Sequence, residues 1–439
     1  MPPRLIPLVR GLLAYLAAKF GIARVDDQQG RRTPWHVLKG NSRFRWYFFG
    51  SVTSDFGTWL ANTAQVVLAY QLAHSVLDVG LVTFAQFTSP LVLGPWAGVA
   101  ADKFGGRRTL LGTQVVSAAT AAALAALDLS GLLNVWVLVA GAWITGLAFT
   151  FALPARNVTV QRLVTPGQLK AAFAMDSVSY NIGRAVAPLV TLAIGVAGVN
   201  FAWAFAANAA SFIVFGVILW RSRMRTAIEP ERRRSRVRDG FLIAWQDPRI
   251  MILLLMVAAV TVADDPILVL GPAIARHLHT SPAWSGWFIA ALGAGTVLGS
   301  FRRSRHRPTV RLGASALAAL ALFMILFTHA PTMWFAVLAA LGAGASCLIA
   351  NSVTRAVLAE LAGQRNSAAV MAVWAIAWAG SKPVASLLDG TLGSWIGPQW
   401  TGVILAAPAL VPITVIVLLV ARDLLLQSFR SIRQVGVGG

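Results

Sequence analysis

The sequence lacks most of the residue patterns on which enzymes and metal sites depend. Its one cysteine, Cys347, excludes a disulfide within the chain and any cysteine cluster for zinc or an iron–sulfur group. The six histidines show neither the H-x-x-H nor the H-E-x-x-H spacing of zinc sites. No G-x-x-x-x-G-K-[ST] loop is present to hold the phosphates of ATP, and no Ser, His and Asp set has the spacing of a nucleophile elbow. We therefore expect no enzymatic activity, no metal and no cofactor.

Acidic residues are also scarce. Asp and Glu number 16 against 37 Lys and Arg, so the formal net charge is +21, while hydrophobic residues make up 57% of the chain. A mean hydropathy of +0.69 and apolar runs such as 135–153 exceed what a soluble fold of 439 residues buries. A basic excess can indicate a nucleic-acid partner. Because the runs between the charges are long enough to cross a bilayer, orientation in a membrane explains the charge better, and we expect no nucleic acid partner.

Twelve apolar stretches are long enough to span a bilayer. A spanning helix needs roughly 20 apolar residues, and a closed barrel is disfavoured because these runs do not alternate apolar and polar residues. The predicted spans are 46–72, 78–101, 108–128, 133–153, 174–198, 201–220, 250–271, 281–300, 312–328, 332–352, 367–390 and 399–421. The predicted fold class is an all-α membrane protein with twelve transmembrane helices.

The basic residues support this map, because Lys and Arg gather in the cytoplasmic loops of membrane proteins. Of the 37 basic residues, all but Arg184, Arg276 and Lys382 fall in the alternate segments assigned to the inside. These segments are 1–45, 102–108, 154–173, 221–249, 301–311, 353–366 and 422–439. An error in the helix count would scramble this alternation. We therefore expect the chain in the inner or plasma membrane, with both termini in the cytoplasm.

A long basic segment divides the chain into halves. Residues 221–249 separate six predicted spans in 42–220 from six in 250–422, and we interpret this segment as a solvated connector rather than a regulatory site. The second and eighth spans end alike, in LGPWAGVAADKFGGRR and GAGTVLGSFRRSRHR, which are glycine-rich and then basic. Parallel halves around a site at mid-membrane depth are the design of many secondary transporters.

The two ends of the chain differ from the halves. Within 1–41, apolar residues recur at helical spacing among basic ones, at Leu5, Leu8, Val9, Leu12, Leu16 and Phe20. This pattern predicts an amphipathic helix on the inner leaflet rather than a cleaved signal peptide. Residues 423–439 are expected to form a cytoplasmic tail.

A few polar residues fall inside the predicted spans. A charge at the centre of a spanning helix costs on the order of 2.5–3.5 kcal/mol on insertion scales, so such residues are candidates for a transport cavity or for proton coupling. The candidates are Asp55, Asn62, Arg184, Asp264, Asp265 and Lys382. The carboxylates Asp78, Asp128, Asp176 and Asp389 lie near predicted span ends, where we expect them to meet water.

The first span carries two of these candidates. Asp55 lies close to mid-depth, roughly 14 Å into its helix. It either loads and releases a proton, as burial allows, or is a carboxylate that meets water in a vestibule or pairs with a neighbouring helix. Asn62 is expected to hydrogen-bond across helices rather than to contact a ligand.

The other candidates also leave alternatives open. Arg184 and Lys382 occupy similar positions in the two halves, and each serves either as partner to a carboxylate or as a docking point for an anionic substrate. Asp264 and Asp265 precede the helix-breaking Pro266 near the outer end of a span. They either meet outside water or take up protons from that side.

The turn GVAADKFGGRR, residues 98–108, resembles the signature turn of the major facilitator superfamily, G-x-x-x-D-[RK]-x-G-[RK]-[RK]. The residues that fit are Gly98, Asp102, Lys103, Gly105, Arg107 and Arg108, and Gly106 stands where a basic residue is usual. Gly98 and Gly105 allow close helix approach and a tight reversal, and Asp102 can face a helix N-terminus or an arginine. The resemblance implies that this cluster latches the two halves in the outward-facing state.

Four further stretches are similar to the branch that contains the enterobactin exporter and macrolide-efflux-like permeases: WLANTAQVVLAYQLAHSVLDVGLV, ALPARNVTVQRLV, DSVSYNIGRAVAPLV and FAANAASFIVFGVIL. The resemblance covers about residues 42–422. It implies the major facilitator fold, with two pseudo-symmetric six-helix bundles that alternate access by a rocker-switch. It also implies protons as the coupling ion and export of a small-molecule substrate such as a drug, siderophore or other secondary metabolite.

Other functions remain open from the sequence. An uptake permease of the same fold is the nearest alternative. A non-transporting membrane scaffold or sensor is another, with the basic connector and the N-terminal helix binding partners or anionic lipid of the bilayer. We expect the chain to be monomeric.

Overall fold

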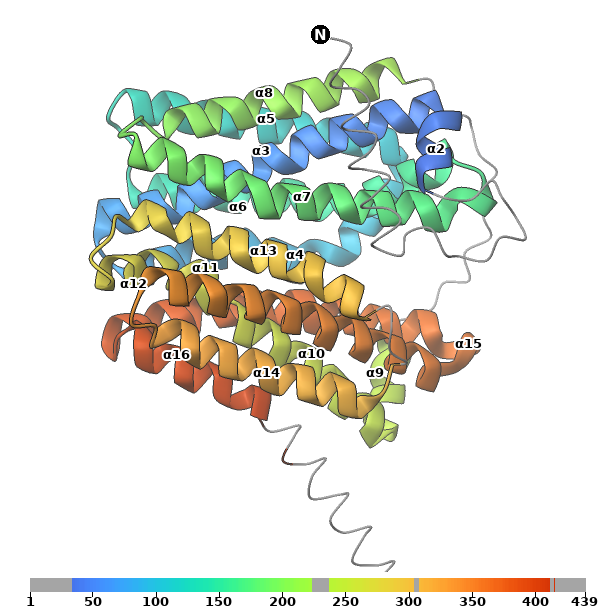
Figure 1. The fold of residues 1–439 in the computed structure, drawn as a ribbon. Helices are drawn as coiled ribbons and strands as arrows, with labels where there is room; N and C mark the ends of the chain where they lie inside the picture. Colours follow the sequence, from blue (N-terminus) through green and yellow to red (C-terminus); the bar gives the residue numbers. More distant parts are fainter. Residues whose placement is uncertain (1–33, 223–236, 304–307, 411–413, 415–439) are drawn as a thin grey trace, which may run out of the picture. The chain divides into compact units, whose positions relative to one another are not determined.

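The computed structural model describes residues 34–222, 237–303, 308–410 and 414. Within these residues the secondary structure is helical, with no strand (Figure 1). Residues 1–33 of the segment predicted to form an amphipathic helix, 1–41, lie outside the described residues. Residues 223–236 of the connector and the whole of the tail also lie outside them.

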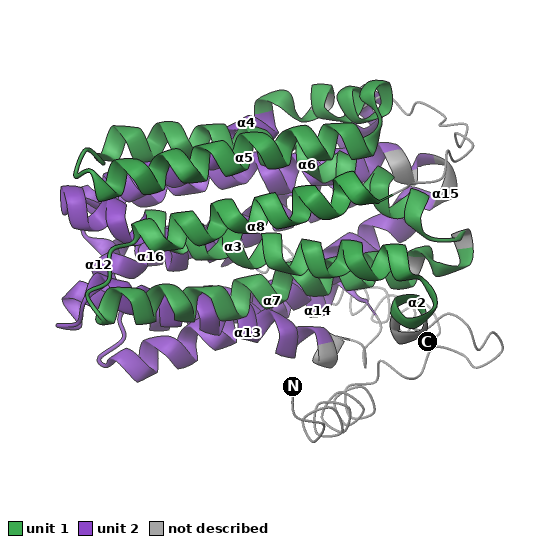
Figure 2. Cartoon of the chain, turned by 90° about the horizontal axis from the view of Figure 1, so that it is seen from above, with its two compact units in different colours: residues 1–65, 92–231 green, residues 66–91, 232–439 purple. Residues whose placement is uncertain are grey.

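The chain forms two compact units, shown in different colours in Figure 2. Unit 1 comprises residues 1–65 and 92–231, and unit 2 comprises 66–91 and 232–439. The helices α3 (Ser42–Ala73) and α4 (Val76–Phe104) therefore each contribute to both units. The other elements of unit 1 are α2 (Pro34–Gly40), α5 (Gly106–Leu129), α6 (Val135–Leu163), η1 (Pro166–Gln168), α7 (Leu169–Val196) and α8 (Ala202–Arg221).

Unit 2 contains a segment that is broken into short helices and one very long helix. Its elements are α9 (Val237–Gln246), α10 (Pro248–Asp264), α11 (Pro266–Val269), α12 (Gly271–His277), η2 (Pro282–Trp284), α13 (Ser285–Arg303), α14 (Val310–Thr328), α15 (Met333–Trp395), α16 (Pro398–Ala406) and η3 (Ala407–Leu410). Within α15, Gly363 has a φ of 64°, a left-handed conformation that glycine adopts without steric cost. α15 is therefore two helices joined at this residue.

Each predicted span overlaps at least one of these helices. Eight helices of the described part of the chain are long and apolar enough to cross a membrane: α4, α5, α6, α8, α10 with α11, α14, and α15 on each side of Gly363. The multi-pass, all-α membrane fold is thereby confirmed. The number of twelve crossings stays a prediction.

Several helices begin where their sequence supplies a capping side chain. The side chains of Asn134, Thr309 and Thr332 accept hydrogen bonds from backbone N–H groups in the first turns of α6, α14 and α15, at 3.1, 3.2 and 3.4 Å. Asp247 caps α10 in the same way, and Pro248 follows at the first helical position, where its missing N–H costs nothing. These caps satisfy orphan backbone donors at the helix starts.

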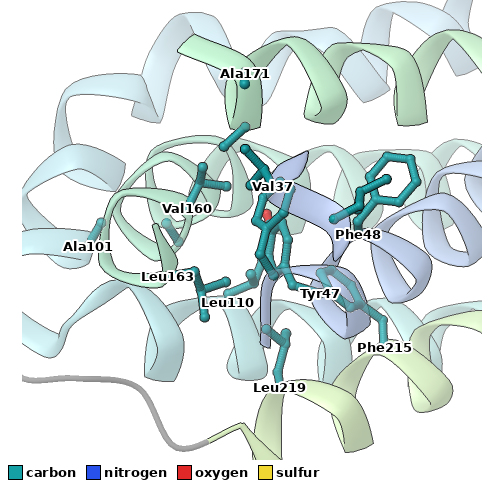
Figure 3. Packing of buried hydrophobic residues seen from close by; sticks show 14 residues of the cluster. Val37, Tyr47, Phe48, Ala101, Leu110, Val160, Leu163, Ala171, Phe215 and Leu219 are labelled. Carbon is teal, nitrogen blue, oxygen red and sulfur yellow. The ribbon is translucent and has the colours of Figure 1, made fainter. Parts of the chain in front are cut away.

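A cluster of buried apolar side chains joins the helices of unit 1 near α2 (Figure 3). It draws at least one residue from each of α2 to α8, and Tyr47 of α3 is among its largest members. The Tyr47 ring contacts Phe44, with centroids 6.2 Å apart, and Phe215 of α8, at 5.5 Å. The cluster fixes α3 two turns before Asp55.

In unit 2, α13 and the first part of α15 pack with their backbones in contact. A Cβ added at Gly299 would lie 2.6 Å from the carbonyl oxygen of Ala345, and one at Gly295 would overlap that of Leu341. The reverse holds for Gly344, where a Cβ would overlap the carbonyl oxygen of Leu292. Small residues let helices in membranes approach closely and gain van der Waals contact.

We expect Gly295→Val to lower the free energy of unfolding by about 1–3 kcal/mol, because α13 must move away from α15 to make room for the side chain. The measurement is the apparent melting temperature of the purified protein in detergent. The matched control is Gly112→Val in α5, where an added Cβ would meet nothing within 4 Å. Equal melting temperatures for the two variants would contradict the prediction.

The last part of the predicted connector 221–249 is helical. Residues 237–246 form α9, and a Cβ added at Gly240 would lie 2.7 Å from the carbonyl carbon of Ala369 in α15. The interpretation of this segment as solvated connector therefore does not hold for α9, which packs against α15 where Gly240 presents no side chain.

Candidate functional site

The signature turn joins α4 to α5. Gly105 has a φ of 82°, which reverses the chain between Phe104 and Gly106. A Cβ added at Gly106 would lie 2.8 Å from the carbonyl oxygen of Ala155 in α6. No side chain fits there, which explains why this position departs from the basic residue of the signature. At Gly98, by contrast, an added Cβ would meet nothing within 4 Å among the described residues, so the close helix approach expected at that glycine is not observed.

The charged residues of this turn have different surroundings. Arg107 Nε donates to the carbonyl oxygen of Leu219 at 2.8 Å, and its Nη2 donates to that of Trp220. These carbonyls belong to the last turn of α8, where a cation is favourable. Asp102, Lys103 and Arg108 are exposed. Arg107 therefore ties α5 to α8 within unit 1.

A buried polar cluster, here called the Arg156 cluster, joins three helices of unit 1. It consists of Ser51 and Asp55 of α3, Arg156 of α6, and Asp176 and Ser179 of α7. Arg156 Nη1 lies 2.7 Å from Asp55 Oδ1, and Nη2 lies 3.0 Å from Asp55 Oδ2 and 2.9 Å from Asp176 Oδ1. Such two-pronged pairing is the strongest geometry for an arginine and a carboxylate.

Both oxygens of the Asp55 carboxylate accept hydrogen bonds. Besides Arg156, it accepts hydrogen bonds from Ser179 at 2.5 Å and from Ser51 at 3.4 Å. This arrangement fits the second interpretation of Asp55 from the sequence, in which the carboxylate pairs with a neighbouring helix.

The packing of α3 against α7 continues beyond this cluster. A Cβ added at Gly183 would lie 2.8 Å from the carbonyl oxygen of Asp55, so the two helices touch here. One turn along α3, the Trp59 ring meets Tyr180 edge-on at 5.5 Å, and the Arg184 guanidinium lies 5.5 Å from the centroid of the Trp59 ring. Asn62 follows on the same helix and is half-buried.

Unit 2 holds a second buried polar cluster, here called the Lys382 cluster. Its members are Asp264 and Asp265 at the end of α10, and Lys382, Ser386 and Asp389 of α15. Lys382 Nζ lies 2.5 Å from Asp265 Oδ1 and 3.9 Å from Asp264 Oδ1. Ser386 donates to Asp265 Oδ2 at 2.5 Å. The cluster joins the break between α10 and α11 to α15.

Two expectations about these carboxylates are corrected. Asp264 and Asp265 were expected to meet outside water or to take up protons, and their exposed fractions of 9% and 0% contradict the first interpretation. Asp389, expected to meet water at a span end, has an exposed fraction of 0%. The physical reason is that α15 runs on to Trp395 and that α4 packs against it at Gly390, the residue after Asp389.

The two clusters share a pattern. In each, a buried aspartate pairs with a cation and accepts a hydrogen bond from a serine on a later helix, from Ser179 to Asp55 and from Ser386 to Asp265. The cations differ in origin, since Lys382 lies on the same helix as its serine whereas Arg156 lies on α6. Lys382 is bound to carboxylates, so it does not present a free charge for an anion. Within the described residues, no group of three or more His, Cys, Asp or Glu has the arrangement of a metal site.

Comparison with known proteins gives consistent results. A family model described as transmembrane secretion effector matches residues 32–429. The uncharacterized MFS-type transporter YfiS of Bacillus subtilis is 24% identical over 268 residues, which are 58% of this chain and 62% of the relative. The enterobactin exporter EntS of Shigella flexneri is 27% identical over 286 residues, 63% of this chain and 66% of the relative. The matched region thus spans less than two thirds of either relative.

Solved structures show the same fold at low identity. The nucleoside transporter NupG matches with a TM-score of 0.66 at 13% identity, covering 84% of this chain and 97% of that protein. A bacterial homologue of the lysosomal transporter Spinster, in an inward-facing and unoccupied conformation, matches with a TM-score of 0.67 at 13% identity, covering 84% and 95%.

Proposed function

Since the chain belongs to the transmembrane secretion effector family of the major facilitator superfamily, we propose that this transporter exports a small organic molecule in exchange for protons. The family and the fold make it a multi-pass membrane transporter rather than an enzyme. Export is supported by the description of the family as secretion effectors and by the similarity to the enterobactin exporter EntS. A siderophore, drug or other secondary metabolite is the substrate class that we propose.

The observation that carries proton coupling is the Lys382 cluster. Ionisable side chains within spanning helices are costly, and they mark substrate pathways or proton relays. Here Asp265 and Asp389 are fully buried in helices that are apolar enough to span the membrane. A change in the proton occupancy of such a group changes the electrostatic energy of unit 2, so that it biases the conformational equilibrium.

Alternating access accounts for the charged turn as well. We propose two six-helix bundles, in 42–220 and 250–422, with both termini in the cytoplasm, that open to one side at a time. In this scheme Gly105 and Arg107 hold the turn in shape, and the exposed Asp102, Lys103 and Arg108 form the latch. Arg107 is assigned to the turn because its donors are occupied by carbonyls of α8.

The test uses inside-out membrane vesicles that contain the full chain, with enterobactin as the first probe and a macrolide as the second. We expect accumulation in vesicles with an acidic interior, without ATP, and its loss when an uncoupler is added. Vesicles without the chain are the control. Accumulation that survives the uncoupler would contradict proton coupling, and accumulation confined to right-side-out vesicles would show an uptake permease.

A further inference from the structure

The Lys382 cluster contains more acid than base. Asp264, Asp265 and Asp389 interact with one another and with the ammonium group of Lys382. Three carboxylates gather around one ammonium, and two of them, Asp265 and Asp389, are fully buried. Two carboxylates that share a site cannot both ionise at low cost. The cluster therefore requires at least one bound proton to be stable as it stands.

The hydrogen bonds indicate which carboxyl holds that proton. Asp265 has a partner at each oxygen, the ammonium of Lys382 in an ion pair 2.5 Å from Oδ1 and the Ser386 hydroxyl, which donates to Oδ2. Asp264 lies 3.9 Å from Lys382 Nζ, and the Cys347 thiol donates to its Oδ2 at 3.7 Å. Neither oxygen of Asp389 has a hydrogen-bond partner among the described residues, although its side chain is fully buried. A buried carboxylate without donors is the costly member of the set.

A proton on Asp389 removes this cost. The Asp389 carboxyl faces that of Asp265 closely enough for the two groups to interact. As anions, both groups can only accept hydrogen bonds, whereas a protonated Asp389 has an O–H that donates to Asp265. One proton thus lowers the negative charge of the cluster and supplies the missing donor.

Helix α4 packs directly on α15 beside the cluster. In unit 2, the beginning of α4 packs on α15 so tightly that a Cβ added at Gly80 would lie 2.6 Å from the carbonyl oxygen of Ser386 and 2.7 Å from Cα of Gly390. From the same helix, the Phe87 ring lies 5.6 Å from Lys382 Nζ. Among the described residues, the titratable groups that face Asp389 are Asp264 at the end of α10, Asp265 directly after it, and Lys382 of α15.

We propose that Asp389 carries a proton in this form of the transporter, donates it in a hydrogen bond to Asp265, and releases it during the transport cycle. On release the O–H bond of Asp389 breaks and the proton passes to water on the side to which the cluster has opened. The ammonium of Lys382 then faces three carboxylates in place of two. This inference rests on the proposed function, since it identifies the group that binds the exchanged proton.

The experiment is infrared spectroscopy of the purified full chain in liposomes, with the proton itself as the ligand and the buffer pH raised in steps. We expect the band of a protonated carboxylic acid near neutral pH, which disappears at high pH. Asp389→Asn should lose this band. Asp389→Glu should keep a band at a shifted frequency, and it covers the case in which Asp389→Asn does not fold. The matched control is Asp247→Asn, since asparagine caps a helix as well as aspartate does and the band should be unchanged.

Two results would overturn this assignment. One is a band of equal size and frequency in the wild type and in both variants at position 389. The other is the absence of a protonated carboxyl in the wild type near neutral pH. Because the spectrum needs no substrate, it separates this inference from the proposed function. A band lost in Asp389→Asn without proton-driven export would contradict the transport proposal alone.

Discussion

Replacing Arg156 with methionine should lower the free energy of unfolding by about 3–5 kcal/mol, which is the usual cost of removing one partner from a buried ion pair. The variant leaves Asp55 facing Asp176 without the cation that lies 2.7 and 2.9 Å from their oxygens. Because α3, α6 and α7 meet at this side chain, the loss should affect all of unit 1. The measurement is the yield of folded protein and its apparent melting temperature in detergent.

Companion variants separate the charge effect from the loss of packing. Arg156→Lys keeps the charge but not the paired geometry, so we expect an intermediate stability. The double variant Arg156→Met with Asp55→Asn removes both charges of the closest pair and should recover part of the loss. Arg221→Met, at the exposed end of α8, is the control and should behave as the wild type. A melting temperature of Arg156→Met equal to that of the control would show that the Arg156 cluster does not stabilise the fold.

Replacing Lys382 with methionine should cost about 3–5 kcal/mol for the same reason, and here the loss should depend on pH. Without the ammonium, the folded chain buries the carboxyls of Asp264, Asp265 and Asp389 only if they bind protons that the unfolded chain does not bind near neutral pH. The folded state then binds more protons than the unfolded state, so stability falls as pH rises. We expect the melting temperature of this variant to increase from pH 8 to pH 5, relative to the wild type.

The control for this variant is Arg311→Met, which removes an exposed cation from the start of α14. Its melting temperature should follow that of the wild type at every pH. Adding Asp265→Asn to Lys382→Met should raise the stability and weaken the pH dependence, because one fewer carboxyl needs a proton. A pH profile of Lys382→Met parallel to that of the wild type would contradict the charge balance inferred for the Lys382 cluster.

Much of the fold could be predicted from the sequence because bilayer thickness and loop charge are strong constraints. Apolar runs of about 20 residues have few alternatives to a spanning helix. Capping residues such as Asn134 and Thr332 also mark the starts of helices in the sequence. The break at Gly363 is different, because the long apolar stretches on both sides do not show how the chain turns between them.

The candidate site could be predicted only in part. The cost of a charge in a span pointed to Asp55, Asp265 and Lys382, which lie in the two polar clusters, but it does not show which residues pair. Arg156 was missed because the expected length of about 20 residues ends the predicted span at residue 153, directly before Pro154. In the structure, α6 continues through this proline to Leu163. An ionisable residue just past a predicted span is therefore worth the same scrutiny as one within it.

Asp389 was missed for the same reason, since span ends read from a sequence are uncertain by several residues. Its neighbour Gly390 packs against α4, and this close contact depends on two glycines that are 310 positions apart in numbering, Gly80 and Gly390. Hydropathy alone contains no signal for such a contact. The departure at Gly106 from the usual basic residue is likewise explained only by the position of α6 beside it.

The segment 248–277 is an interrupted helix rather than a continuous one. It consists of α10, α11 and α12, with one residue between successive pieces, and Pro266 at the first joint has no N–H to continue the hydrogen-bond ladder. Helices kink at prolines and at other interruptions of the hydrogen-bond ladder rather than within their regular turns. Asp265 is the residue between α10 and α11, so any change in its charge or its partners acts where this segment kinks most readily.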